Sequence, residues 1–443
     1  MYDLHSRKRS AQQQSSIGDA SVQLPQRLNL DAFAGERRKS TSRGLRLSCA
    51  ATTLFLALAG VFCYLVVHHR HRRVILKVMT DPWSGHSLLR ESSVGFHHFL
   101  HSGPPRYVTV VMPSVVNPKK RTRRLEAIAD TWGPLSNAVY VVHNVSEFPK
   151  ASRQVHYRQE RKPVDPYAYP QMLLVPPDIT VEDGLPRLNY VIRNVYEKIN
   201  PDFAFFVNDH TYVIPEHACR YLHKLDPTKD LYAGRALRNH KEAFNSGAAG
   251  YFLSRQSMKR LVQSWDDQKP ECVVGQEDKW LQGNPGLVTA KCLHHELNVP
   301  ALDTREKGKF HRFQAFGLVR VVEGKVDEWY LNKHENLKEI TGFDASYGTV
   351  LSGEDCCSKE TVSFHYVEFK ETRALFAARQ EILKDPTMSD QALQEMMLRE
   401  WPTDWGELGG YSRRLPDKDS NSEWKPLLAV MRKISSRHTQ MDC

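Results

Sequence analysis

Three polar residues, Asn208, Asp209 and His210, follow directly on a run of apolar and aromatic residues, Phe203 to Val207. Such a run, bounded by turn-forming residues, is typical of a buried strand in an α/β sheet. Open α/β sheets bind nucleotides at the carboxyl ends of such strands. An aspartate beside a histidine there could hold a divalent metal ion against a diphosphate. An ordinary Asx turn uses the same residue types, so position alone leaves both interpretations open.

Two further places carry residues that could do chemistry. Glu277 and Asp278 precede a segment with a helical pattern, and a carboxylate in a cleft can take the proton of a hydroxyl. Acidic residues at a helix N-terminus are also common for structural reasons alone. His365 lies among aromatic residues, where histidine is more often packed than ligating. It becomes a candidate only if the fold brings it to Asp209 and His210.

The remaining pattern predicts an α/β domain with a mostly parallel, twisted sheet and helices on both faces, because strands alternate with helices. Small residues between 245 and 250 precede an aromatic strand, and they would let the backbone approach a ligand or form a tight turn. Strands are predicted over 107–112, 139–142, 203–207 and 231–234, and helices over 118–132, 188–199 and 215–225.

An uncharged segment of 21 residues, Leu47 to Val67, is long enough to cross a bilayer as one helix. A cleaved signal peptide is the rival, but its charged segment would be unusually long. The basic flanks slightly favour a cytoplasmic N-terminus. We therefore expect a disordered cytoplasmic tail over 1–46, an anchor over 47–67 and a lumenal stem over 68–105. The clustering of basic residues before residue 73 indicates membrane flanks rather than a nucleic-acid surface.

The cysteines fit an oxidising compartment. Six of the eight lie beyond the anchor, and no CxxC pair occurs, so disulfides are favoured over metal ligands. The single sequon, at Asn144, is consistent with a glycosylated lumenal surface loop. The six cysteines are Cys219, Cys272, Cys292, Cys356, Cys357 and Cys443.

Residues from about 107 to 380 resemble the core 1 β-1,3-galactosyltransferase group of the β-1,3-glycosyltransferases. The matching pieces occur in the family's order and together span nearly two thirds of the chain. They are Ala129 to Trp132, Thr211 to Ile214, Ser246 to Ser254, Glu277-Asp278 between Cys272 and Cys292, Asp303 to Arg305 before Phe310 to Phe313, and Cys356 to Ser358 with Val362 to Val367.

The resemblance implies a GT-A fold over 106–385, followed by a C-terminal extension over 386–443. It also implies a single-pass type II protein of the Golgi or ER–Golgi membrane, a UDP-sugar donor, a Mn²⁺ ion and inversion at the anomeric carbon. The implied roles are a base at Asp278 with Glu277; metal ligands at Asp209, His210 and His365; donor contacts at Asn208, Asp209, Ser246, Gly247, Ala248, Gly250, Asp303 and Arg305; acceptor stacking at Trp329 and Tyr330; and disulfides at Cys272, Cys292, Cys356 and Cys357.

The chain departs from the family where three aspartates are usual and Asn208, Asp209 and His210 stand instead. Imidazole remains a good ligand for manganese-like ions. We therefore expect an enzyme that moves galactose from UDP-galactose to a GalNAc-bearing glycoprotein, with a homodimer as one expected assembly. A different donor or acceptor sugar is one alternative. The other is a catalytically silent lumenal chaperone, which the two lost acids favour and the retained Asp278 and His365 oppose.

Overall fold

The computed structural model describes residues 106–113, 118–144, 171–180, 182–239, 241–275, 277–332, 337–401 and 414–436. All of them lie in the compact unit Asp81–Cys443. The predicted tail, anchor and stem lie outside the described residues. Within the described ranges, no helix is long and apolar enough to span a membrane.

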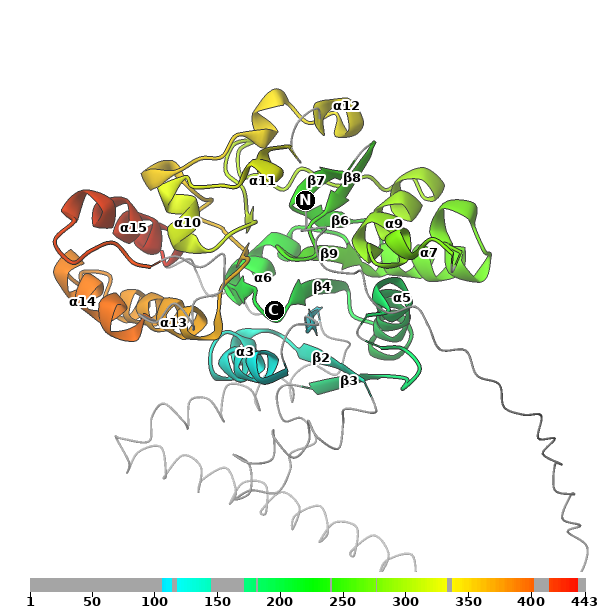
Figure 1. The fold of residues 1–443 in the computed structure, drawn as a ribbon, viewed down its shortest axis with the longest axis horizontal. Helices are drawn as coiled ribbons and strands as arrows, with labels where there is room; N and C mark the ends of the chain where they lie inside the picture. The colour runs from blue at the N-terminus through cyan, green and yellow to red at the C-terminus, as the bar shows by residue number, and fades with distance from the viewer. Residues whose placement is uncertain are drawn as a thin grey trace, which may run out of the picture. The chain divides into compact units, whose positions relative to one another are not determined.

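The larger sheet confirms the predicted α/β class. Its strands are β1 (Tyr107–Met112), β2 (Val139–Asn144), β3 (Gln171–Val175), β4 (Phe203–Asn208), β6 (Tyr232–Gly234) and β9 (Tyr251–Ser254). They lie in the order β3-β2-β1-β4-β9-β6 (Figure 1). The first four strands along the chain run parallel, and β9 runs antiparallel to both β4 and β6. The sheet is therefore mixed and mostly parallel.

Alternate residues of β4 point into two different cores, which explains why the whole strand is apolar. Phe203, Phe205 and Val207 enter one core, and Ala204 and Phe206 enter the other. Because both faces of a parallel sheet are covered, its strands have no polar face. The first core is covered by α3 (Pro118–Asp130), α6 (Pro215–His223) and α10 (Leu318–Glu323), and the second by α5 (Gly184–Asn194) with π-helical η3 (Val195–Ile199), α7 (Arg255–Asp266) and α9 (Pro285–Lys291).

Two smaller sheets accompany the larger one. β5 (Tyr212–Val213) follows β4 after a turn, and β11 (Ser363–Phe364) lies between β5 and β10 (Phe313–Gln314). β11 is parallel to β10 and antiparallel to β5. β7 (Ala236–Asn239) and β8 (Glu242–Asn245) form an antiparallel hairpin. Short helical segments complete the unit: η1 (Gly133–Leu135), η4 (Pro270–Cys272), α8 (Lys279–Gln282), π-helical η5 (Cys292–Glu296), α11 (Glu328–Asn332), α12 (Leu337–Thr341), η6 (Ala345–Gly348) and η7 (Gly353–Asp355).

The helices α13 (Phe369–Lys384), α14 (Asp390–Glu400) and α15 (Asn421–Ile434) pack against one another beside α3 and α10 (Figure 1). Trp401 and Trp424 are buried in the same core as β4. The described part of residues 386–443 therefore shares the core of the preceding domain.

Two disulfides involve the four cysteines that the resemblance assigned. Cys272 bonds to Cys292, and Cys356 bonds to its neighbour Cys357. The first bridge closes a loop that contains Glu277 and Asp278. Cys219 is disulfide-bonded as well.

Candidate functional site

The pairing of β11 with β5 brings His365 to the end of β4. Phe364 pairs with Tyr212, and the backbone N–H of Val367 donates to the carbonyl of His210 at 3.0 Å. The end of β4 is also a turn, because the N–H of Thr211 donates to the carbonyl of Asn208. Asn208, Asp209 and His210 therefore form a turn and also carry the side chains of the candidate site.

The two imidazole rings face each other, with their Nε2 atoms 2.8 Å apart. On the far side of each ring, Nδ1 faces an oxygen: Asp209 Oδ1 lies 3.2 Å from His210 Nδ1, and the carbonyl of Ala315 lies 3.3 Å from His365 Nδ1. A carbonyl can only accept, so His365 carries its proton on Nδ1 and turns a lone pair from Nε2 toward His210. Burial, together with the nearby His210 and Arg124, holds the pKa of His365 well below its usual range, so this ring is neutral.

An ion-pair network fixes the carboxylate of Asp209. Arg124 of α3 reaches Asp209 Oδ1 at 3.5 Å and His210 Nδ1 at 3.4 Å. Its guanidinium also donates twice to Glu368, at 3.0 and 2.7 Å, and Lys120 lies 2.9 Å from Glu368. Burial favours the neutral form of Glu368, but hydrogen bonds and charge from Arg124 and Lys120 outweigh it and lower its pKa. Glu368 thus stays ionised.

The spacing of the two imidazole nitrogens suits a divalent metal ion. Imidazole nitrogens bind first-row ions at about 2.1 Å, so two ligands at right angles stand about 3 Å apart. The 2.8 Å between the Nε2 atoms of His210 and His365 is close to that spacing. Ligating histidines usually donate their other N–H to a carboxylate or a carbonyl, and Asp209 and Ala315 supply both acceptors. The Nε2 atoms of His210 and His365 therefore fit a metal when His210 carries its proton on Nδ1, toward Asp209 Oδ1.

The small-residue segment 246–250 lies against this strand end. Thr211 Oγ1 donates to the carbonyl of Ala248 at 2.8 Å, and the hydroxyl of Ser363 donates to the carbonyl of Ala249. Gly250 has φ +87°, and a Cβ there would lie 2.6 Å from the ring of Phe205. The structure thus gathers Asn208, Asp209, His210, His365 and the segment with Ser246, Gly247, Ala248 and Gly250.

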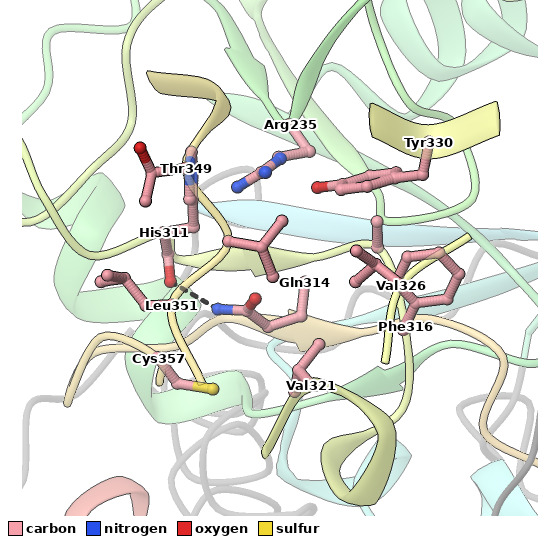
Figure 2. A pocket seen from close by; sticks show the side chains of 12 residues that line it. Arg235, His311, Gln314, Phe316, Val321, Val326, Tyr330, Thr349, Leu351 and Cys357 are labelled. Atoms are coloured by element: carbon pink, nitrogen blue, oxygen red, sulfur yellow. Dashed lines mark hydrogen bonds between the residues drawn. The ribbon is translucent and has the colours of Figure 1, made fainter. Parts of the chain in front are cut away.

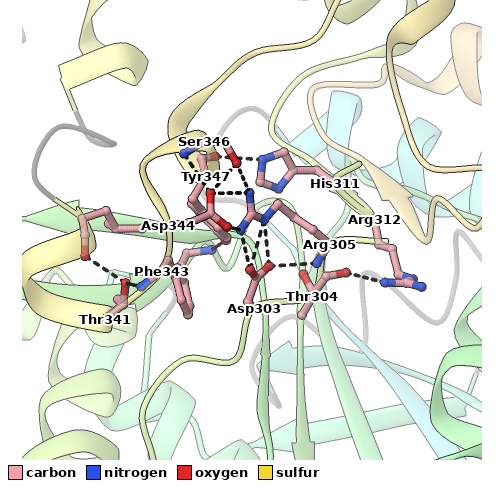
Figure 3. Close-up of polar contacts among 12 residues, drawn as sticks. Asp303, Thr304, Arg305, His311, Arg312, Thr341, Phe343, Asp344, Ser346 and Tyr347 are labelled. Carbon is pink, nitrogen blue, oxygen red and sulfur yellow. Dashed lines mark hydrogen bonds and ion pairs between the residues drawn. The ribbon is translucent and has the colours of Figure 1, made fainter. Parts of the chain in front are cut away.

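Asp303 and Arg305 are joined to each other and held at the edge strand β6. Arg305 donates to Asp303 and to Asp344, each at 2.6 Å, and its guanidinium lies over the ring of Tyr347 (Figure 3). Hydrogen bonds from Arg305 and then Ser346 hold the pKa of Asp344 far below its usual range. Thr304, between Asp303 and Arg305 in the chain, donates from Oγ1 to the carbonyl of Gly234 in β6 at 2.8 Å.

Glu277 and Asp278 lie on the wall of a separate open cavity of about 200 Å³, whose lining comes from residues 270–291. Asp278 Oδ1 accepts the backbone N–H of Leu281 at 3.0 Å and caps α8. Asp278 therefore does stabilise a helix N-terminus, which is the structural alternative that the sequence left open. Helix α9, which follows this segment, lies close to the strand that precedes residues 246–250. A Cβ on Gly286 of α9 would lie 4.0 Å from the carbonyl of Asn245.

The acceptor and glycosylation candidates lie elsewhere. Trp329 and Tyr330 are in α11, and the Tyr330 ring is buried against Phe316 and under Arg235. Tyr330 lines a cavity of about 20 Å³, room for about one water molecule and not for a sugar (Figure 2). Asn144 is only 4% exposed and its Nδ2 donates to the carbonyls of Pro176 and Ile179. This placement disfavours a glycan on Asn144.

Sequence reasoning missed Arg124 and Glu368. Arg124 is four residues before Ile128 on α3, so helical spacing places it on the buried face, and this signal was present in the sequence. Glu368 is the N-cap of α13, and its side chain forms a capping box with Glu371. No local pattern indicates that Glu368 also binds an arginine 244 residues away.

No family model matches the chain. Among curated proteins, the chain is similar to glycoprotein-N-acetylgalactosamine 3-beta-galactosyltransferase 1 of Xenopus laevis, at 25% identity over 168 residues. The match covers 38% of this chain and 42% of that relative, so it spans less than half of the relative's length. The chain is a distant relative of a GalNAc β-1,3-galactosyltransferase.

Proposed function

We propose that this protein is an inverting β-1,3-glycosyltransferase that moves galactose from UDP-galactose to the 3-hydroxyl of GalNAc on O-glycosylated proteins. The observation that carries the proposal is the meeting of His210, His365 and the segment 246–250 at the carboxyl end of β4. That edge is where open α/β sheets bind nucleotides. The distant relationship to a galactosyltransferase supports the choice of reaction.

At the donor end, His210 and His365 would hold Mn²⁺, and Asp209 would keep His210 in the ligating tautomer. When bound, the ion stabilises negative charge on the leaving diphosphate. Arg124 fixes Asp209, and Glu368 fixes Arg124. The backbone of 246–250, which carries no bulky side chain, would lie beside the donor sugar.

At the acceptor end, Asp278 is the proposed base. The acceptor oxygen forms a bond to the anomeric carbon while the bond from that carbon to the UDP oxygen breaks. The acceptor proton passes to the carboxylate, and UDP leaves with the bonding electrons. The hydrogen bond from Leu281 fixes one carboxylate oxygen of Asp278. The cavity beside it leaves room for a hydroxyl, and the proposal requires the acceptor to extend from this cavity to the donor sugar at the end of β4.

The test is transfer of galactose from UDP-galactose to a GalNAc-α-peptide by the full-length protein, with and without Mn²⁺. Asp278→Asn should lower kcat by about 100-fold or more, because general base catalysis contributes about that much. Asp267→Asn, an exposed aspartate at the end of α7, is the matched control and should leave the rate unchanged. Turnover that survives Asp278→Asn would refute the assigned base.

A catalytically silent relative is the second candidate. The capping role of Asp278 and its position in a cavity lined by residues 270–291 favour it, since both need no catalysis. This candidate predicts that UDP-galactose binds but is neither hydrolysed nor transferred. Metal-dependent turnover by the wild-type protein would exclude it.

A further inference from the structure

A second group of metal-ligating side chains lies where the β7–β8 hairpin meets η5. Glu242 begins β8, and His294 and His295 belong to η5. His295 Nε2 lies 2.9 Å from both carboxylate oxygens of Glu242. The two imidazole rings are 4.6 Å apart, centre to centre. One ligand atom from each of the three side chains lies within 4.8 Å of the other two.

The local fold explains why two consecutive histidines approach the same carboxylate. A π-helical turn contains more residues than an α-helical turn, so neighbouring side chains diverge by a smaller angle. The hairpin then places Glu242 opposite this turn. Within the described part of the chain, the His294 side chain makes no hydrogen bond, so its nitrogens are available. The nearby Lys291 is engaged by Glu271 at 2.9 Å.

We propose that Glu242, His294 and His295 form a surface site for a divalent first-row ion of the zinc type. Two imidazole nitrogens and one carboxylate oxygen are a donor set that Zn²⁺ uses, with water in the fourth position. Ligands around a tetrahedral ion stand about 3.4 Å apart. Ligand atoms that are now up to 4.8 Å apart must therefore close by up to about 1.4 Å, and His295 Nε2 and the Glu242 carboxylate, now 2.9 Å apart, must separate by about 0.5 Å. Exposed and half-buried side chains such as these can do so by rotating.

The ion would join two parts of the chain that border the donor and base segments. β8 leads into Asn245 and Ser246, and η5 begins at Cys292, which is bonded to Cys272. A bound ion would therefore tie the hairpin to the disulfide-closed loop. This inference does not depend on the proposed transferase activity.

The test is Zn²⁺ titration of the metal-stripped full-length protein by calorimetry, with thermal unfolding as a second readout. Wild type should bind with a dissociation constant of about 10 μM or tighter, and its unfolding midpoint should rise by several degrees. Glu242→Gln, His294→Asn and His295→Asn should each weaken this binding by about tenfold or more. Mn²⁺ should bind more weakly than Zn²⁺ at this donor set.

His223→Asn, an exposed histidine on α6, is the matched control and should leave binding unchanged. Because His210 and His365 could also take Zn²⁺, the titration is carried out in His210→Asn as well, where the binding that remains reports Glu242, His294 and His295 alone. If Glu242 and the two histidines form only a surface ion pair, His210→Asn will show no saturable binding, and the proposal fails. Binding in the His210→Asn background that survives all three site variants would overturn it equally.

Discussion

At the scale of single residues, the orientation of two rings decides the chemistry at the end of β4. Each imidazole has an oxygen on its Nδ1 side, so the two Nε2 atoms face each other. His365 could be marked as a candidate from its sequence, but its meeting with His210 could not. The two residues are 155 positions apart, and only the pairing of β11 with β5 joins them.

Asp209 should act on the metal through His210. Asp209→Asn keeps the shape of the side chain but removes the carboxylate that faces Nδ1. Loss of such a partner typically weakens metal affinity by about 10- to 100-fold. Mn²⁺ binding in the presence of UDP, followed by electron paramagnetic resonance, measures the effect. Asp267→Asn should have no effect, and equal Mn²⁺ affinity in Asp209→Asn and wild type would show that Asp209 does not orient a ligand.

A buried histidine makes stability depend on pH. Burial, and then the charge of Arg379, lowers the pKa of His217 to about 4 from 6.5. Between these values the unfolded chain binds a proton that the folded protein does not. Stability is therefore full above pH 6.5 and lost as pH falls toward 4, by up to about 1.4 kcal/mol per pH unit. His365 contributes in the same direction, because its pKa is also lowered.

Urea unfolding between pH 7 and pH 4.5, about the span of these two pKa values, measures this dependence. His217→Gln removes one titrating group and keeps an N–H that can reach the carbonyl of Thr361, the partner of His217. The variant should lose less stability on acidification than wild type. The exposed His223→Asn should follow the wild-type curve, and identical slopes in all three proteins would contradict the assignment.

At the scale of elements, the apolar pattern of the sequence predicted the long buried strands but not the short ones. β1 and β4 were predicted almost to the residue, because a long apolar run between turn residues has one outcome in a doubly covered sheet. β10 and β11 were not predicted as strands, since two residues carry no period. Their partners, which are distant in sequence, determine them.

Gly250 tests the close approach of the donor segment to β4. Gly250→Ala places a Cβ 2.6 Å from Phe205 in a left-handed conformation, whereas Gly342→Ala is left-handed with open space around it. Both variants pay about 1–2 kcal/mol for the conformation, and Gly250→Ala should lose a further 1–3 kcal/mol or so to overpacking. Chemical unfolding of the two variants measures the difference. Equal losses would mean that the segment can move away from Phe205.

At the scale of the whole molecule, the C-terminal helices belong to the body of the protein. Composition alone did not show this, because the tryptophans of residues 386–443 stand among charged and proline-containing segments. In the fold, α15 packs against α10, α13 and α14, and Trp424 Nε1 donates to the carbonyl of Asp417. The apolar face of α15 is buried only because α10, α13 and α14 cover it, and these partners cannot be identified from the local sequence.

Trp424 and Trp280 form a matched pair for this point. Trp424 is 1% exposed and Trp280 is 52% exposed. Trp424→Ala should cost about 3–5 kcal/mol of unfolding free energy, because it leaves a large cavity. Trp280→Ala should cost about 0.5 kcal/mol or less. If urea unfolding gives similar values for both, the C-terminal helices do not pack on the core.

We propose that the end of β4, the segment 246–250 and His365 form one metal-assisted site for a nucleotide sugar. Calorimetric titration of UDP-galactose into the full-length protein, with Mn²⁺ and with a chelator, is the decisive experiment. We expect saturable binding that needs Mn²⁺, is weakened about tenfold or more by His365→Asn and is unchanged by His223→Asn. The proposal fails if UDP-galactose does not bind, or if its affinity for wild type with Mn²⁺ is unchanged by the chelator and by His365→Asn.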